Sequence, residues 1–440
     1  MNDSFLRQTD ELSRRRFMNY ASKSLLGVSV IPTMLPMAGF AADKKAAPAP
    51  APAAPGKKPT ARNIIYLYMS GGMTHVDTFD PKPEAGEKVS GPAKAINTKA
   101  DGVQISEYLP LIAKQMDKIC LVRGLTTTQG AHEQGNYFMH SSYTMRGTIQ
   151  HPGIGAWLLR MEGKTNRPLP GSVCIGGGAN GGGAGFMESK YAPLYVGSPN
   201  DGVPNSKSRV GTNQFNERLM LSNKFDQAFH SKYDVKKVRA YTDMYDDAVR
   251  LMRSEDLKAF NLNLEDQKVR EEYGQNGFGQ GCLLARRLIE NDVRHVEVTL
   301  GGWDTHNNNF AAVQNLGATL DQAVSALLVD LDRRGMLEET MIVLTTEFGR
   351  TPYVNENDGR DHFPKAFSGF IAGGGVKGGQ AYGKTNEHAT DVVEGKMTPP
   401  DFNATIAYGL GLPLDEIIYS PSKRPFTIAD KGAPVTQIFG

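Results

Sequence analysis

Short apolar runs and longer amphipathic segments alternate along most of this 440-residue chain. Short β-rich apolar runs are typical of buried strands, whereas apolar residues at intervals of three and four are typical of helices. Strands are predicted at Asn63–Met69, Ile119–Val122, Ser172–Ile175, Val293–Leu300, Thr340–Leu344 and Phe367–Ala372. Helices are predicted at Ser106–Lys118, Gly153–Met161, Phe278–Asn291, Leu316–Arg334 and Phe402–Leu410. This order predicts one large α/β domain over residues 63–440, built on a parallel sheet.

Two internal segments depart from the alternation. Residues 176–212 are rich in glycine and serine and show little periodicity, which predicts a long loop or lid. Residues 213–272 are highly charged, with no glycine or proline between Phe215 and Glu272. We expect this second segment to be a helical insertion that covers the sheet. The tail after Pro413 is expected to be irregular.

The N-terminal 62 residues differ in composition from the rest of the chain. Ser13–Met18 reads SRRRFM and precedes a moderately apolar segment, Tyr20–Phe40, that ends in small residues. This pattern is typical of a twin-arginine export signal, here residues 1–42. A membrane anchor is the alternative, which the polar residues and prolines of the segment disfavour, and no later stretch is apolar enough to span a bilayer. Residues 43–62, rich in Ala, Pro and Lys, are predicted to be a disordered linker.

The charge balance depends on this N-terminal region. The whole chain has a formal charge of +2, but residues 1–62 hold ten of its 49 Lys and Arg and only four of its 47 Asp and Glu. The remainder is therefore mildly acidic, which argues against nucleic acid as a partner. The three cysteines are far apart in sequence, and buried free thiols are expected, with one disulfide as the alternative.

Polar side chains gather after the predicted strand that ends at Leu344. Glu347 and Arg350 follow at once, and Arg360, Asp361 and His362 come soon afterwards. Ligands of open α/β sheets bind beyond the carboxyl ends of the strands, so these residues predict a site for a metal or an anionic ester. The arginines could clamp a phosphate or sulfate, and the Asp-His pair could bind a metal. The alternative is structural ion pairing, for example between Glu347 and Arg350.

Asp304 and His306 follow the preceding predicted strand and are separated by one residue. In an extended segment such residues point to the same side, so both could reach one ion. Mixed imidazole and carboxylate ligands suit zinc, manganese or iron better than calcium. The alternative is that Asp304 caps the next helix and His306 lies on the surface.

Further polar residues follow the first two predicted strands. Asp77 and His75 come after the first strand, and a predicted helix after the second carries His132 and His140. Asp77 and His132 are additional candidate metal ligands. His75 and His140, taken singly, are expected to be exposed histidines without a special role.

Covalent ester hydrolysis would need a nucleophile. Thr127 and Thr128 lie where the second predicted strand meets a helix. A helix N-terminus stabilises an oxyanion, so these two hydroxyls are the candidates. The alternative is an ordinary threonine run after a strand.

Several motifs of this chain resemble those of one bacterial family. They are IYLYMSGGMTHVDTFDPKP, GWDTH, LTTEFGRTP, GRDHFPKAFSGFIAGGGVKGGQAYGKT and PPDFNATIAYGLGLP. On these motifs nearly the whole mature chain is identified as a member of domain of unknown function 1501. This family resembles a sulfatase-like branch of the alkaline phosphatase superfamily. The resemblance implies a doubly wound α/β core and metal-dependent hydrolysis of phosphate or sulfate monoesters.

The same resemblance suggests roles for individual residues. Asp304 and His306 would stand where the superfamily places an Asp and a His on one metal, and His362 would be its late histidine. The second Asp-His-Gly motif of the superfamily reads Glu347-Phe348-Gly349 here, so one histidine ligand is absent. The first strand ends in Ser70-Gly71-Gly72 rather than in an aspartate. One metal, an altered site and a lost activity are all compatible with these departures.

The leading hypothesis from the sequence is a periplasmic or secreted metal-dependent hydrolase, sulfatase- or phosphatase-like. Its divalent metal would be zinc or manganese, and its substrate a small anionic ester or a sulfated or phosphorylated glycan. The alternative is a non-catalytic cell-envelope protein that uses the same fold to bind a ligand. After signal cleavage no stable membrane span is expected.

Overall fold

The computed structural model describes residues 60–177, 182–230 and 236–440. The predicted export signal and all but the last three residues of the predicted linker lie outside these ranges. Pro59–Gly440 form one unit by their contacts. Within the described ranges, no helix has both the length and the apolar character needed to cross a membrane.

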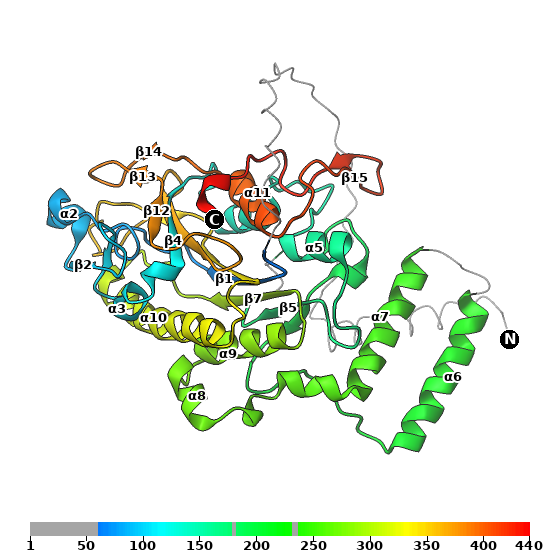
Figure 1. Ribbon diagram of the computed structural model, residues 1–440. Coiled ribbons are helices and arrows are strands. Elements are labelled where there is room, and N and C mark those ends of the chain that lie inside the picture. The colour runs from blue at the N-terminus through cyan, green and yellow to red at the C-terminus, as the bar shows by residue number, and fades with distance from the viewer. Residues whose placement is uncertain (1–59, 178–181, 231–235) are drawn as a thin grey trace. The chain divides into compact units, whose positions relative to one another are not determined.

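An eight-stranded sheet runs through the centre of this unit in the order β12-β4-β11-β8-β1-β7-β5-β6 (Figure 1). Its strands are β1 (Asn63–Met69), β4 (Ile119–Leu125), β5 (Ser172–Ile175), β6 (Leu194–Val196), β7 (His295–Leu300), β8 (Thr340–Thr345), β11 (Phe367–Ala372) and β12 (Gln380–Tyr382). All neighbours are parallel except β11, which is antiparallel to β4 and β8. The predicted mostly parallel α/β fold is confirmed, and each of the six predicted strands is present.

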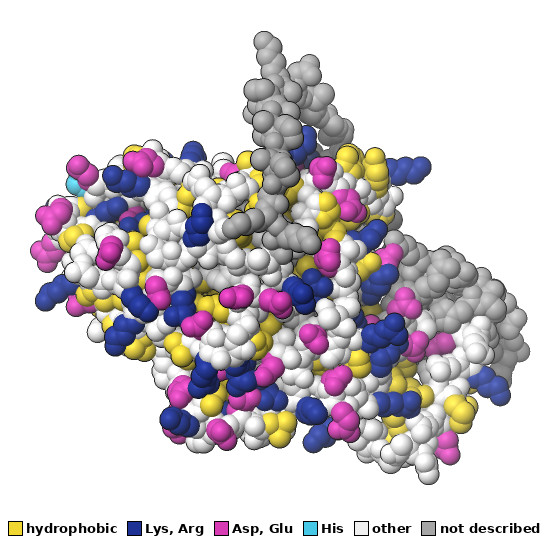
Figure 2. All heavy atoms as spheres, in the orientation of Figure 1, with side chains coloured by type: hydrophobic (Ala, Val, Ile, Leu, Met, Phe, Trp, Pro, Cys, Tyr) yellow, Lys and Arg dark blue, Asp and Glu magenta, His cyan; other side chains and the backbone are white. Residues whose placement is uncertain are grey.

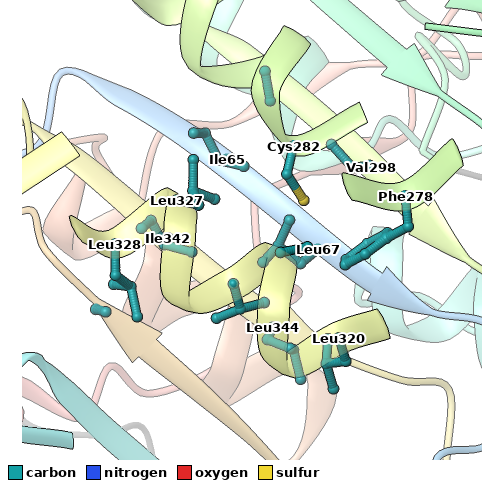
Figure 3. Packing of buried hydrophobic residues seen from close by; sticks show 14 of the residues in the cluster. Ile65, Leu67, Phe278, Cys282, Val298, Leu320, Leu327, Leu328, Ile342 and Leu344 are labelled. Atoms are coloured by element: carbon teal, nitrogen blue, oxygen red, sulfur yellow. The ribbon is translucent and has the colours of Figure 1, made fainter. Parts of the chain in front are cut away.

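Helices cover both faces of the sheet. They are α4 (His132–Ser141), α5 (Ile154–Glu162), α9 (Gly277–Glu290), α10 (Asn309–Arg333) and α11 (Pro399–Gly409). Successive side chains of β1 point to opposite faces, as in any strand. Ile65 and Leu67 pack in one cluster with Leu327 of α10 (Figure 3), whereas Tyr66 packs in a second cluster with Trp157 of α5. Burying one such apolar side chain contributes about 1.5–3 kcal/mol, so the two clusters make the sheet a rigid support.

The helix predicted over Ser106–Lys118 is wrong in extent. Only a single turn, α3 (Pro110–Ala113), and the 3-10 segment Met116–Lys118 are helical. The residue before a proline disfavours helical angles, and Leu109 accordingly has φ −126° and ψ 49°. The apolar spacing that suggested a helix serves burial instead, because Leu109, Ile112 and Met116 are fully buried.

The predicted loop over 176–212 contains the edge strand β6, so that prediction is wrong at this point. The strand is only three residues long and pairs with β5 on one side. Two apolar residues flanking Tyr195 do not make an alternating pattern long enough to be recognised in the sequence. The predicted irregular tail likewise contains a minimal hairpin, β15 (Ile418–Tyr419) and β16 (Pro425–Phe426).

The helical insertion is present as α6 (Thr212–His230), α7 (Lys236–Arg253) and α8 (Gln267–Tyr273). The expectation that it covers the sheet is wrong for its first two helices. Figure 1 shows α6 away from the sheet, and its Met220 and Phe225 are 67% and 76% exposed. The helix α7 packs against the 3-10 segments Ser189–Tyr191 and Glu255–Phe260, while α9 and α10 cover this part of the sheet.

The remaining short strands and helix lie in the connections. They are α2 (Glu87–Ser90), β2 (Ala95–Asn97), β3 (Gln104–Ser106), β9 (Gly349–Arg350), β10 (His362–Phe363), β13 (Lys384–Thr385) and β14 (Val392–Glu394). Further 3-10 segments are Pro83–Ala85, Leu262–Leu264 and Thr436–Ile438. Basic and acidic side chains are interspersed over the face drawn in Figure 2.

The three cysteines are buried and free, as predicted. Burial raises the pKa of the Cys120 thiol to about 12 and raises the pKa of Cys174 and Cys282 as well. The thiolate is the reactive form of cysteine, so these side chains act as core residues.

Candidate metal centre

The candidate site lies in the loops that follow the carboxyl ends of β4, β7 and β8. The loop after β4 leads to His132, the first residue of α4, and the loop after β7 carries Asp304 and His306. The segment after β8 contains β9, whose Arg350 pairs with His362 of β10. The carboxyl ends of parallel strands lie at one edge of a sheet, so residues far apart in sequence meet there.

Two glycines allow these loops to approach one another. Gly71 has φ +119°, and a Cβ there would lie 2.6 Å from the backbone nitrogen of Asp304. A Cβ at Gly359 would overlap the carbonyl oxygen of His306. Any larger residue at either position would displace the segment that carries Asp304 and His306.

Three imidazole nitrogens meet at one carboxylate oxygen. The Nε2 atoms of His132, His306 and His362 lie 3.3, 3.2 and 3.3 Å from Asp304 Oδ1. The Nε2 atoms of His306 and His362 are 3.1 Å apart. Within the described part of the chain, His132, Asp304 and His362 form a group whose ligand atoms all lie within 4.8 Å of one another.

The opposite nitrogen of each ring faces a hydrogen-bond acceptor. His132 Nδ1 lies 2.7 Å from Glu347 Oε1, and His306 Nδ1 lies 2.7 Å from Asp361 Oδ1. His362 Nδ1 lies 2.8 Å from the carbonyl oxygen of Gly130. Because an ionised carboxylate or a carbonyl can only accept, each Nδ1 must carry the proton. In the neutral tautomer, all three Nε2 lone pairs therefore face the same point.

This arrangement fits a divalent metal. Zinc binds histidine nitrogen at about 2.0–2.1 Å, so neighbouring ligands of a tetrahedral ion lie roughly 3.3 Å apart. The three separations from Asp304 Oδ1 and the separation between His306 and His362 are close to that value, and His132, Asp304 and His362 together lie within reach of one ion. The Nε2 atom of His132 is buried and makes no well-aligned hydrogen bond within the described chain, although Asp304 is nearby. A ligating histidine whose other nitrogen donates to a carboxylate or carbonyl is the usual arrangement around zinc.

The charges around the site favour ionised Asp304. Burial opposes its ionisation, but the hydrogen bond and charge of Arg350, helped by His132 and His362, lower the pKa of the carboxyl to about 2. The hydrogen bond that His132 donates to Glu347 raises the pKa of His132, against its partial burial. Asp304 does not cap α10, since Asn308 holds the N-cap position and no side-chain cap bond forms there.

Glu347 and Asp361, both predicted as metal ligands, contact the Nδ1 side of the histidines instead. Glu347 is buried and accepts hydrogen bonds from the Tyr68 hydroxyl at 2.9 Å and the Gly71 N–H at 2.8 Å, besides that of His132. Burial alone would raise the pKa of Glu347, but these hydrogen bonds lower it. The ion pair of Glu347 with Arg350, the alternative for these two residues, does not form. The two carboxylates thus orient His132 and His306 by accepting hydrogen bonds from their Nδ1 atoms.

The two arginines differ in what they can offer. Arg350 is buried and donates to the carbonyls of Gly71, Gly72 and Arg360 and to Asp304. All five N–H groups of Arg360 are used within the protein, on the carboxylate of Asp77 and on three backbone carbonyls. Arg360 therefore has no donor for an anion, contrary to the role predicted for it.

Asp77 lies outside the histidine group, which consists of His132, Asp304, His306 and His362. Its carboxylate is fully buried and accepts hydrogen bonds from Arg360, Asn309 and Thr74. This buried ion pair ties the loop after β1 to the segment that precedes His362. The role predicted for Asp77 as a ligand is replaced by this structural one.

Among the described residues, Thr127 and Thr128 make no hydrogen bond to the histidine group. Thr127 is nearly buried, and its hydroxyl accepts the N–H of Gln129 at 3.2 Å. Thr128 is exposed, and its hydroxyl accepts from the Gln129 side chain. The first residue before α4 is Ala131, so neither threonine caps the helix.

The expectation of exposed His75 and His140 is wrong. His75 is buried and its Nε2 faces the carbonyl of Ala389 at 3.0 Å. His140 is buried, lies 3.4 Å from Glu297 of β7, and contacts the ring of Tyr68. A lone histidine in a helix gives no sequence signal of burial, because its partner is on a distant strand. Tyr68, which reasoning from sequence missed, was signalled only as a hydroxyl within an apolar strand.

The fold and the site define an α/β protein with a histidine-rich candidate metal centre at the carboxyl edge of its sheet. The chain belongs to the family described as "Protein of unknown function (DUF1501)", which matches residues 61–439. Among curated proteins, none matches its sequence.

Solved structures with a similar arrangement include sulfatases and phosphatases. PsFucS1 sulfatase from Pseudoalteromonas sp. is 15% identical, with 86% of this chain and 73% of that chain covered and a TM-score of 0.39. A TAB5 alkaline phosphatase mutant with bound Mg is 12% identical, with 81% and 100% covered and a TM-score of 0.36. The C-terminal periplasmic domain of EcEptC from Escherichia coli, in complex with Zn, is 10% identical, with 87% and 96% covered and a TM-score of 0.37. At these scores the likeness carries no weight for the activity of this chain.

Proposed function

We propose that this protein is an exported metal-dependent hydrolase of sulfate or phosphate monoesters. The observation that carries the proposal is the meeting of three histidine Nε2 atoms at Asp304 Oδ1, with every Nδ1 held by an acceptor. His132, Asp304, His306 and His362 would hold one ion, zinc or manganese. Such an ion polarises an ester oxygen and lowers the pKa of a water molecule.

Access to the site supports catalysis rather than a purely structural ion. The side chains of His132, Asp304, His306 and His362 are between 26% and 48% exposed. An ion with a purely structural role is shielded from solvent, whereas a catalytic ion has to be reached by its substrate. An ester could therefore reach these atoms from solvent.

Arg350 would supply positive charge beside the ester. Four hydrogen bonds fix its guanidinium, and one of them goes to Asp304. Arg350 would hold Asp304 in place and would attract an anionic group by its charge. Arg360 and Asp77 are assigned to the scaffold. Thr128, exposed and in the loop that ends at Gly130, is the remaining hydroxyl candidate for a covalent nucleophile.

A non-catalytic metal or ligand-binding protein is the second candidate. It is favoured by one specific observation: among the described residues, no serine or threonine hydroxyl is hydrogen-bonded to His132, Asp304 or His362, the group whose ligand atoms lie within reach of one ion, or to the adjacent His306. In this case the ion would stabilise the loops after β4, β7 and β8 without turning over an ester.

The test begins with metal analysis of the purified protein, followed by assays against p-nitrophenyl sulfate, p-nitrophenyl phosphate and sulfated or phosphorylated oligosaccharides. His306→Ala should lose bound metal and hydrolysis while keeping the circular dichroism of the wild type. His388→Ala, an exposed histidine outside the group, is the matched control and should keep both. Thr128→Ala distinguishes two routes of hydrolysis. It would leave hydrolysis intact if water attacks the ester, and it would abolish hydrolysis if Thr128 is a covalent nucleophile.

Three outcomes are decisive. Hydrolysis that disappears with metal in His306→Ala supports the enzyme. A wild type that binds metal but leaves all these esters intact favours the binding protein. A wild type that takes up no zinc or manganese contradicts both readings of the site.

Export is proposed on the N-terminal sequence alone. A full-length tagged chain should be recovered outside the cytoplasm, and Arg14→Lys combined with Arg15→Lys should retain it inside. Equal distribution of both chains would contradict export by the twin-arginine route.

A further inference from the structure

A cavity lies beside the connection that leads into the amino end of β5. Its volume is about 580 Å³, within the range of small-molecule sites. Its walls include the end of α5, residues 163–167 of the connection that leads into the amino end of β5, and part of α7. The site of the histidine group follows the carboxyl ends of the strands, so this cavity is not an extension of it.

The lining of the cavity is strongly basic. Five cationic side chains face two carboxylates: Arg160, Lys164, Arg167, Lys190 and Arg250 against Glu162 and Asp247. Lys164 and Arg250 share the single carboxylate of Asp247, at 3.2 and 2.6 Å. The cavity therefore keeps an excess of positive charge after its internal ion pairs are formed.

Two guanidinium groups of this lining have no partner within residues 60–177, 182–230 and 236–440. Arg160 and Arg167 make no hydrogen bond or ion pair to any other residue that the structure describes, although carboxylates are nearby. Guanidinium groups present planar pairs of donors that match the oxygens of phosphate, sulfate and carboxylate. Arg160 and Arg167 are exposed, so their guanidinium donors are accessible to an oxyanion-bearing ligand in the cavity.

The rest of the lining is suited to the body of such a ligand. Leu159 is buried, Met161 is half-buried, and the ring of Tyr191 has Lys190 above it, with Nζ 5.1 Å from the ring centre. These side chains give the cavity an apolar wall beside its basic groups. Sites for small ligands commonly combine an apolar wall with a few polar groups that fix orientation.

We infer that this cavity binds a small molecule carrying a phosphate, sulfate or other oxyanion, with Arg160 and Arg167 as the residues that recognise the anion. The inference is independent of the proposed hydrolase, because it involves none of the residues of the histidine group. Its ligand would be held and not transformed, since no residue of the lining has been placed to act as a nucleophile.

The test is calorimetric titration of the full chain, kept metal-free with EDTA, with phenylphosphonate and separately with inorganic sulfate. Phenylphosphonate cannot be hydrolysed as an ester, so the measurement reports binding alone. Arg160→Gln with Arg167→Gln should weaken binding by about tenfold or more, as expected for the loss of two charge-assisted hydrogen bonds. Arg167→Gln alone should give an intermediate loss.

The matched control is Arg209→Gln with Arg218→Gln, which removes the same charge from exposed positions elsewhere. It should bind like the wild type, as should His306→Ala. Tighter binding of phenylphosphonate than of sulfate would show that the natural ligand carries its oxyanion on a larger body, and equal binding that the oxyanion alone is recognised. No saturable binding of either probe, or equal weakening in the control pair, overturns the inference.

Discussion

Glu347→Gln provides the sharpest test of how the histidine group is supported. Glu347 does not reach the Nε2 atoms, yet its Oε1 lies 2.7 Å from His132 Nδ1 in a buried environment. The substitution keeps the shape of the side chain and removes its charge. An amide oxygen can still accept the hydrogen bond from His132 Nδ1–H, so the change isolates the contribution of the charge.

The size of the effect follows from that contact. A hydrogen bond to a charged group contributes about 1.5–3 kcal/mol, against about 0.5–1.5 for a neutral one. The difference, roughly 1 to 1.5 kcal/mol, corresponds to about tenfold in metal affinity. Substitutions behind a metal-bound histidine typically cost about 10- to 100-fold. We expect Glu347→Gln to fall in this range.

Asp361→Asn is the matched comparison, because Asp361 holds His306 in the same way. Its side chain is 55% exposed, so solvent screens its charge. Exposed ion pairs contribute about 0.2–1 kcal/mol, which predicts less than about fivefold loss. The buried and exposed carboxylates should therefore differ measurably.

The assay is a competition titration of zinc against a chromophoric chelator at constant pH, with thermal unfolding in EDTA as a control for the fold. Glu347→Gln that binds zinc within twofold of the wild type, with an unchanged fold, would refute the supporting role. So would an Asp361→Asn loss that equals or exceeds the loss at Glu347.

Three further outcomes are expected. Asp77→Asn leaves the buried guanidinium of Arg360 without its counter-ion. It should lower the free energy of unfolding, measured by urea titration, by about 3–5 kcal/mol. A loss below about 1 kcal/mol would contradict a buried ion pair. The pKa of His140 is raised above 6.5 and that of Glu297 lowered below 4.5, in both cases by their mutual attraction against the effect of burial. The stabilisation by this pair should be complete between pH 4.5 and 6.5. It should be lost as the pH rises through the folded pKa of His140, and also as the pH falls through the folded pKa of Glu297. A Glu297→Gln variant whose free energy of unfolding has the same pH profile as the wild type would contradict this. Phe225→Ala on the exposed face of α6 should change the free energy of unfolding by less than about 0.5 kcal/mol. Leu327→Ala in the core should lower it by about 2–5 kcal/mol. Similar losses at the two positions would show that α6 is packed.

The sheet could be predicted from sequence because its strands are local patterns. Asn63–Met69 and Phe367–Ala372 are apolar runs bounded by polar or glycine-rich turns, and their predicted limits equal those in the structure. The gathering of Asp304, His306 and His362 followed from one rule, that loops after parallel strands share an edge. That rule places segments without any knowledge of side-chain contacts.

The roles within the site could not be read in the same way. Whether a carboxylate faces the Nδ1 or the Nε2 side of a histidine is decided by distances of a few ångströms between distant segments, as for Glu347 and His132. The partner of Arg360 is Asp77, which lies 283 positions away. Residue type and spacing could show that these side chains are able to bind a metal or an anion. They could not show which of the side chains form ion pairs with one another instead.

The four residues of the histidine group come from three connections that are separate in sequence, and none of these holds more than two of the four side chains. A truncated or partly folded chain therefore cannot assemble the group, since its geometry exists only when β4, β7 and β8 are aligned. Tight uptake of zinc would thus report that folding is complete. It would distinguish finished molecules from intermediates more selectively than a measurement of helix or strand content.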